Sequence, residues 1–322
     1  MVSFNIRGVR YSTPRYLGAF NMVDQPLQVV CATDRFYLEM TGVLIASITS
    51  QSHQRPVSIF LICSGLRATD KSRLLRCVNG TARLQFIDID DQKAQILSNL
   101  PVKRHLTVTA YARLLIPDML PELDGRILYM DCDVVVNAPL DELFSVDLAG
   151  KVVGAAQNQA TSERLEELNK SLNRPFSAPY FNSGVLLIDL VEWRRQEIGR
   201  RVIASAATWS NDSGDHDQAV LNLVLDDKWQ EIHPKWNSNP MRVSPVEAAR
   251  MPVQHFWGKR KPFFTDYPKP YRQAYDRYRA ITPWAKALRL SKTRRRLRSK
   301  VGTWKKIIQR SACAVSVHFL CK

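Results

Sequence analysis

The sequence is short of acidic residues relative to basic ones, and its last segment has none. The 322 residues include 46 Lys and Arg against 30 Asp and Glu, which gives a formal net charge of +16. Residues 281–322 hold twelve of the basic residues and no acidic one, so residues 1–280 carry a net charge of only +4. The basic character therefore belongs to a C-terminal tail. A nearly neutral body argues against a protein whose main surface binds nucleic acid.

Long apolar runs and patterned cysteines are also missing. No uninterrupted apolar run reaches the length of about 20 residues that crosses a bilayer. The first twenty residues contain no continuous apolar segment of the kind that secretory signal peptides have. The six cysteines are scattered without a C-x-x-C pair, so a disulfide framework is not indicated. These absences predict a protein of the reducing cytoplasm.

The sequence does contain short apolar runs that alternate with segments of helical spacing. The runs expected to form buried strands are residues 27–34, 57–65, 82–90, 126–136 and 180–190. The last of these is expected to be entered through an Asn-Ser-Gly turn at residues 182–184. The segments expected to form helices are residues 36–52, 68–78, 109–120, 191–210 and 215–225. Continuous apolar strands alternating with helices indicate an α/β fold, whose mixed and mainly parallel sheet is covered on both faces.

Three regions follow from this pattern. Residues 1–26 are expected to be an N-terminal lead-in, and residues 27–282 a single Rossmann-like domain. Residues 283–322 are expected to be a basic helical tail. Ligands of such sheets bind beyond the carboxyl ends of the strands. Asp34 ends the first expected strand and lies at that edge.

Two aspartates one residue apart, Asp131 and Asp133, stand inside the apolar run "RILYMDCDVVV" (residues 126–136). Side chains along a strand alternate with period two, so both carboxylates point to the same side. Burying two neighbouring carboxylates is costly, because each loses its hydration and the two repel each other. A divalent cation would relieve both costs. Taken alone, the spacing favours aspartates that cap a helix or lie in a loop, because a D-x-D pair often occurs by chance.

Five blocks in a fixed order resemble the retaining glycosyltransferases of family 8, which include bacterial lipopolysaccharide α-galactosyl- and α-glucosyltransferases. The likeness runs from about residue 28 to residue 263, and the lipooligosaccharide galactosyltransferases are most alike. It implies a GT-A fold for the domain. The blocks are "CATDRFY", "RHLTVTAYARLLIPDMLP", "RILYMDCDVVV", "YFNSGVLLIDLVEWRR" with "DHDQAVLN", and "HFWGKRKPF".

The resemblance implies a metal site. Asp131, Asp133 and His255 would bind Mn²⁺, with Mg²⁺ as an alternative, and the metal would bridge the diphosphate of a UDP-sugar. Two carboxylates and one imidazole suit such a metal better than one that seeks thiolates. A histidine taken alone is more often structural, and only the surrounding block supports its assignment as a ligand.

The resemblance also implies residues that bind the donor. Gly258 and Lys261 match a phosphate-binding turn, in which glycine lets the backbone approach the diphosphate and lysine neutralises charge on the leaving UDP. Asp34 matches a position that contacts uracil and ribose, and Arg113 matches an arginine near the donor sugar. Asn158 stands where galactose-specific members have an aspartate, so galactose and glucose both remain candidate donor sugars.

Three further residues match the place of the reacting sugar. Asn182 matches an asparagine near the donor sugar, and Asp217 with Gln218 matches an Asp-Gln pair. Glycosyl transfer passes through an oxocarbenium-like state. Front-side attack with Gln218 as a stabiliser is favoured over double displacement, because an amide is a poor nucleophile. The chain departs from its relatives at residues 35–36, where Arg-Phe replaces Asp-Asn.

The tail from Pro283 onward mixes basic and large apolar residues. Leu297, Val301, Trp304 and Ile308 fall on one helical face, which is typical of a helix lying on an anionic membrane surface. Trp284 is expected to favour the same interface. Polynucleotides also bind basic tracts with aromatic residues, so nucleic acid is a less favoured alternative.

We therefore predict a metal-dependent retaining hexosyltransferase that is peripheral on the cytoplasmic face of the inner membrane. It would move galactose or glucose from a UDP-sugar to a lipopolysaccharide-core or similar glycan, which could be lipid-linked. The alternative from another class is a non-catalytic protein that binds nucleotide-sugars or glycans.

Overall fold

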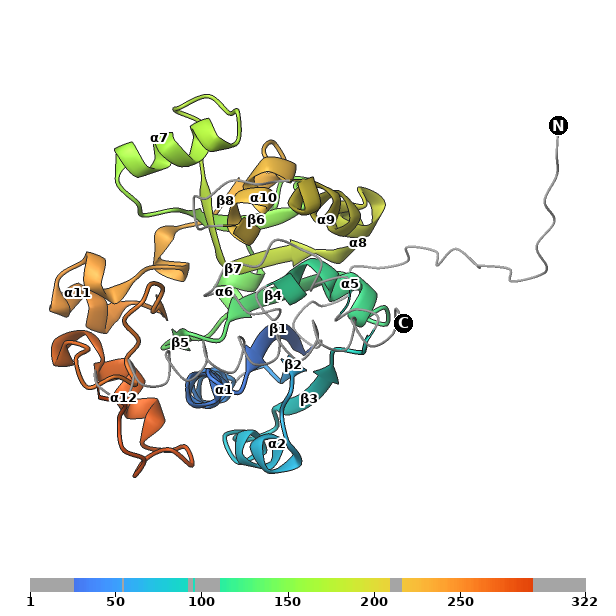
Figure 1. Ribbon diagram of the computed structural model, residues 1–322. Coiled ribbons are helices and arrows are strands. Elements are labelled where there is room, and N and C mark those ends of the chain that lie inside the picture. Colours follow the sequence, from blue (N-terminus) through green and yellow to red (C-terminus); the bar gives the residue numbers. More distant parts are fainter. Residues whose placement is uncertain (1–25, 54, 92–94, 96–110, 209–215, 292–322) are drawn as a thin grey trace, which may run out of the picture.

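The computed structural model describes residues 26–53, 55–91, 95, 111–208 and 216–291, and the statements below concern this part of the chain. Seven strands form one mixed sheet in the order β3-β2-β1-β4-β7-β6-β8 (Figure 1). The strands β1 to β4 run parallel, whereas β7 is antiparallel to both β4 and β6. The strands are β1 (Leu27–Asp34), β2 (Val57–Ser64), β3 (Arg83–Asp88), β4 (Arg126–Asp131), β6 (Val153–Gln157), β7 (Phe181–Asp189) and β8 (Trp229–Glu231). The predicted α/β fold with a mainly parallel mixed sheet is confirmed.

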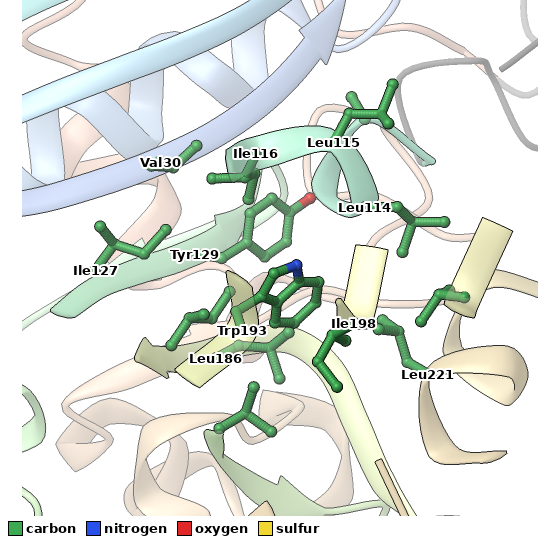
Figure 2. Packing of buried hydrophobic residues seen from close by; sticks show 14 of the residues in the cluster. Val30, Leu114, Leu115, Ile116, Ile127, Tyr129, Leu186, Trp193, Ile198 and Leu221 are labelled. Atoms are coloured by element: carbon green, nitrogen blue, oxygen red, sulfur yellow. The ribbon is translucent and has the colours of Figure 1, made fainter. Parts of the chain in front are cut away.

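Helices cover both faces of the sheet, because successive side chains of its strands point to opposite faces. In β4, Leu128 and Met130 pack into one apolar cluster, and Ile127 and Tyr129 pack into the other. The first cluster includes residues of α1 (Leu38–Gln51), α2 (Ala68–Leu75) and α6 (Asp141–Phe144). The second, part of which is shown in Figure 2, includes residues of η1 (Ala112–Leu115), α5 (Ile116–Met119), α8 (Leu190–Arg195), α9 (Ile198–Thr208) and α10 (His216–Val224).

The remaining elements connect or follow the strands of the large sheet. The helix α7 (Ser162–Ser171) connects β6 to β7, and the short segments η2 (Pro234–Trp236), η3 (Pro240–Arg242) and α11 (Pro245–Arg250) follow β8. The last described elements are η4 (Lys269–Tyr271) and α12 (Gln273–Arg279). The helix α12 packs against α1, where Glu39 accepts hydrogen bonds from Arg279 at 2.7 Å and from Tyr275 at 2.8 Å.

The run 126–136 does not form the single strand that we predicted. The strand β4 ends at Asp131, a turn follows, and Val134–Val136 form a separate strand, β5. This strand pairs antiparallel with β9 (Val253–His255), and Val134 lies opposite His255. All three valines are fully buried, and the backbone N–H of Val136 donates to Ser47 Oγ of α1 at 3.0 Å. The aspartates thus leave the large sheet at its carboxyl edge, and the valines re-enter the core in a second sheet.

Two other sequence predictions were wrong in detail. Residues 182–184 were expected to be a turn before a strand, but they lie inside β7. Residues 191–210 were expected to be one helix, but α8 and α9 are separated at Glu197, whose φ is 50°. A positive φ in a residue other than glycine is incompatible with a continuous α-helix.

The segment 109–120, expected to be one helix, is described only from Tyr111 onward. There it forms the 3₁₀ turn η1 followed by the short helix α5. Pro117 lies in the first turn of α5. Proline has no N–H to donate to a preceding turn, so the helical hydrogen bonds do not run unbroken through this position.

Trp284 lies in the core, not at an interface as we expected. It is 6% exposed, and the Arg73 guanidinium lies 4.4 Å from its ring centroid. It fills the space beside Gly42 of α1, where an added Cβ would come within 2.5 Å of the indole ring. The packed body therefore includes Trp284, whereas residues 292–322 of the predicted tail lie outside the described residues. No helix that the structure describes is both long and apolar enough to span a membrane.

We expect Trp284→Ala to lower the free energy of unfolding by about 3–5 kcal/mol, because it empties a buried site of indole size. Urea denaturation followed by circular dichroism measures this change. The matched control is Leu288→Ala, since Leu288 is 79% exposed and its loss changes stability by less than about 0.5 kcal/mol. Equal stability of the two variants would contradict the packing of Trp284.

Candidate active site

Chemically active side chains gather at one edge of the large sheet. Asp34 ends β1, Asp131 ends β4, and Asn158 follows β6. The antiparallel strand β7 begins at the same edge, where it carries Asn182. The carboxyl ends of strands are where ligands of open α/β sheets bind.

Asp131, Asp133 and His255 come together although His255 is more than 120 residues away in the sequence. Their ligand atoms all lie within 4.8 Å of one another. His255 Nε2 is 3.2 Å from Asp133 Oδ1 and 3.7 Å from Asp131 Oδ2. The pairing of β5 with β9 produces this arrangement, because Val134 directly follows Asp133 and lies opposite His255. Two carboxylates and an imidazole without a thiolate are a donor set that fits Mn²⁺ or Mg²⁺.

Two buried cations balance the two carboxylates. Asp131 Oδ1 accepts hydrogen bonds from Arg113 Nη2 and from the Tyr129 hydroxyl, each at 2.8 Å. Asp133 Oδ2 accepts one from Lys261 Nζ, which also donates to the Phe256 carbonyl at 2.8 Å. Lys261 is 7% exposed, so its charge is held inside the site and not in solvent.

The two carboxyl groups respond differently to this environment. Removal from water raises the pKa of Asp131, and the charge of Arg113 offsets only part of that rise. Removal from water also acts to raise the pKa of Asp133, but Lys261 and His255 outweigh it and hold that pKa well below its usual range. Asp133 is therefore the more firmly ionised of the pair.

Arg113 connects the Asp131 carboxylate to α10 and β7. It is 5% exposed, and its Nη1 donates to the Ser183 carbonyl at 2.6 Å and to Ser183 Oγ at 3.1 Å. Its Nη2 lies 3.2 Å from Asp217 Oδ2. Burial acts to lower the pKa of Arg113, but Asp131 and the other anions outweigh it, so the pKa is raised and the guanidinium stays charged.

The other two residues that we matched to the reacting sugar face the start of β7. Gln218 Oε1 accepts a hydrogen bond from the backbone N–H of Ser183 at 3.0 Å. Asn182 Oδ1 accepts one from the backbone N–H of Gly184 at 3.0 Å. The structure therefore brings Asn182, Asp217 and Gln218 to the same strand end as the acidic group.

Gly184 leaves no room for a side chain. A Cβ at this position would lie 2.0 Å from His255 Cε1 and 2.9 Å from Asp131 Oδ2. Contacts under 3.0 Å force a neighbour to move, and both neighbours here are candidate metal ligands. Glycine is thus required for the imidazole and the carboxylate to approach each other.

Three predicted donor-binding residues lie around this centre without a described bond to the acidic group. Asp34 Oδ1 accepts hydrogen bonds from the backbone N–H groups of Phe36 at 2.8 Å and Tyr37 at 3.2 Å, which fixes the chain just before α1. Asn158 Oδ1 accepts one from the Ala160 N–H at 3.0 Å. Gly258 has a φ of 94°, which favours glycine in the turn between His255 and Lys261.

The sequence alone did not reveal Asn237 or Tyr129 as part of the site. Tyr129 could have been found, because it is two residues before Asp131 in the same strand and therefore points to the same side. Asn237 lies in the irregular segment after η2, where no periodicity indicates which side chains turn inward. It is fully buried, and its Oδ1 lies 2.8 Å from His255 Nδ1.

Comparisons with known proteins agree with this geometry. The chain is 30% identical over 284 residues to general stress protein A of Bacillus subtilis (strain 168). The match covers 81% of this chain and 96% of that protein. It is 24% identical over 263 residues to the lipopolysaccharide 1,3-galactosyltransferase of Salmonella typhimurium, covering 78% of this chain and 77% of that one.

A crystal structure of the galactosyltransferase LgtC with donor and acceptor sugar analogues has the same fold. The TM-score is 0.67 at 23% identity, over 82% of this chain and 97% of that one. Residues 28–266 match the family model described as glycosyl transferase family 8. The predicted GT-A fold and family are confirmed, and the chain belongs to glycosyl transferase family 8.

Proposed function

We propose that this glycosyltransferase is a retaining, metal-dependent hexosyltransferase that moves galactose or glucose from a UDP-sugar. The observation that carries the proposal is the convergence of Asp131, Asp133 and His255 with the buried cations Arg113 and Lys261 at one sheet edge. Family membership gives a nucleotide-sugar donor and a glycan acceptor. A lipopolysaccharide-core or similar acceptor is supported by relatives named as lipopolysaccharide galactosyl- and glucosyltransferases.

Asp131, Asp133 and His255 would hold the divalent metal, Mn²⁺ or Mg²⁺. When bound, such an ion supplies positive charge to the diphosphate as it leaves the sugar. Lys261 and Arg113 are fixed cations beside the same carboxylates, and both are suited to contact diphosphate oxygens. Removing one preorganised donor of this kind typically lowers kcat by about 100- to 1000-fold.

The residues near β7 favour front-side attack. In this proposal the acceptor hydroxyl forms its bond to the anomeric carbon on the face from which UDP departs, and its proton passes to the departing diphosphate. Gln218 Oε1 already accepts a hydrogen bond from the Ser183 N–H, which makes an amide oxygen still poorer as a nucleophile. Asp217 forms an ion pair with Arg113, so its negative charge is already balanced by the guanidinium. Gln218 then serves to stabilise cationic character on the sugar.

We further propose that the part of the predicted tail (residues 283–322) that follows the buried Trp284 associates with an anionic membrane on its cytoplasmic side. The twelve basic residues of 281–322 and the apolar face of Leu297, Val301, Trp304 and Ile308 support this proposal. A lipid-linked acceptor at the membrane would explain such a placement.

Metal removal tests the proposed reaction. We expect the protein with Mn²⁺, UDP-galactose or UDP-glucose and core oligosaccharides to form an α-linked product, with the anomer determined by NMR. EDTA and Asp131→Asn should each abolish most of the transfer, because the diphosphate then lacks its counter-charge. Asp227→Asn is the control, since this aspartate is 81% exposed and lies outside the site. Transfer that persists in EDTA would refute the metal assignment, and a β-linked product would refute retention.

Gly184→Ala should weaken Mn²⁺ binding strongly, because the new methyl group displaces His255 or Asp131. Isothermal titration calorimetry with Mn²⁺ and UDP measures the affinity. Gly154→Ala is the matched control: its methyl group would meet the Leu148 and Ile232 side chains of the core at 2.9 and 3.1 Å. This control should lose thermal stability yet bind Mn²⁺ as the wild type does. Equal Mn²⁺ affinity of the two variants would contradict our account of Gly184.

A chain that ends at Ser291 keeps Trp284 and lacks most of the basic tail. We expect it to be released from vesicles that contain phosphatidylglycerol, while its transfer to an acceptor sugar in solution is retained. Vesicle co-sedimentation at several salt concentrations measures the binding, with vesicles of neutral lipid as the control. Undiminished binding of the shortened chain to anionic vesicles would place the membrane contact elsewhere.

A further inference from the structure

A chain of hydrogen bonds runs from a backbone N–H of β7 to the imidazole of His255. The Gly184 N–H donates to Asn182 Oδ1 at 3.0 Å. Asn237 Nδ2 lies 2.9 Å from the same Oδ1 and 3.2 Å from the Asn182 carbonyl. Asn237 Oδ1 lies 2.8 Å from His255 Nδ1. Asn182, Asn237 and His255 are 7%, 0% and 3% exposed, so solvent contributes little to these contacts.

The backbone N–H at one end fixes the direction of every bond in this chain. Because the Gly184 N–H can only donate, the Asn182 atom that faces it is the carbonyl oxygen Oδ1. The Asn237 atom that faces this oxygen and the Asn182 carbonyl must then be the amino group, Nδ2. Asn237 Oδ1 is left to face His255 and can only accept. The Nδ1 atom of His255 therefore carries a proton.

A proton on Nδ1 determines what the other ring nitrogen offers. A neutral imidazole has one N–H and one lone pair. In the neutral form that binds a metal, the lone pair of His255 therefore lies on Nε2. Nε2 is the atom directed at the carboxylates of Asp131 and Asp133. This is the form of histidine that ligates a metal, and a hydrogen-bond acceptor on the other nitrogen is the usual device that selects it.

The same series of hydrogen bonds determines which atom of Asn182 can bind a sugar. Its Oδ1 accepts two hydrogen bonds, from the Gly184 N–H and from Asn237 Nδ2. The Nδ2 amino group is therefore the part of Asn182 that is suited to donate to a bound ligand.

We propose that Asn237 is a positioning residue that holds His255 in its metal-binding tautomer and orients Asn182 toward the donor sugar. The inference rests on the proposed function, since it takes His255 as a metal ligand. Asn237 acts through its two neighbours and is not itself assigned a contact with metal or sugar. The two roles use different atoms, Oδ1 for the histidine and Nδ2 for the asparagine, so substitutions can separate them.

The test measures the dissociation constant of Mn²⁺ by electron paramagnetic resonance, with and without UDP. Asn237→Leu removes both hydrogen bonds at similar volume and should weaken Mn²⁺ binding about 10- to 100-fold, as losses of metal-supporting partners do. Asn237→Asp keeps an acceptor for His255 but has no amino group for Asn182. It should restore Mn²⁺ affinity to near the wild-type value while kcat for transfer stays low.

Two controls separate positioning from general damage to the fold. Asn169→Leu also removes a fully buried asparagine, but one whose side chain bonds, within the described part of the chain, to the loop 176–178 and Arg174. It should lower the melting temperature without changing Mn²⁺ affinity. In a His255→Ala background, Asn237→Leu should weaken Mn²⁺ binding no further, because Asn237 acts through the imidazole.

The outcomes distinguish this inference from the proposed function. Wild-type protein that binds no Mn²⁺, with or without UDP, would overturn the metal assignment itself. A folded Asn237→Leu variant with wild-type Mn²⁺ affinity would overturn only the role of Asn237. So would an equal loss of Mn²⁺ affinity from Asn237→Leu in the wild-type and His255→Ala backgrounds. If Asn237→Leu does not fold, Asn237→Ala enters the same comparisons with Asn237→Asp.

Discussion

The acidic pair at the end of β4 constrains everything around it. Two carboxylates at the edge of a buried sheet are stable only when positive charge lies close to both. Arg113 supplies it to Asp131, and Lys261 supplies it to Asp133. These cations come from segments 18 and 128 residues away in the sequence, so the charge balance exists only after the chain has folded.

The second sheet provides the remaining partner. Because β5 turns away from the large sheet directly after Asp133, it can pair with β9 and bring His255 beside the carboxylates. Gly184 then allows the imidazole to lie against β7, where any side chain would collide with it. The two-stranded sheet and the absence of a side chain at Gly184 thus decide the geometry of the acidic group.

Two buried side chains join the proposed metal and sugar halves of the site. Arg113 bridges Asp131 and Asp217, and Asn237 bridges His255 and Asn182. A site held this way needs little rearrangement when charge develops during a reaction, which is the condition for electrostatic stabilisation. The hydrogen-bond donors and acceptors around the two aspartates are therefore held in fixed orientations.

The sequence by itself determined the elements whose cause is local. Continuous apolar runs set strands such as β1, whose predicted bounds the structure reproduces, and the five ordered blocks set the family. Folding decided what depends on distant partners: that the valines after Asp133 form a strand of their own, and that Trp284 fills the space beside Gly42. It also decided that Asn237 faces His255. An irregular loop has no period from which inward side chains can be predicted, so only tertiary packing specifies them.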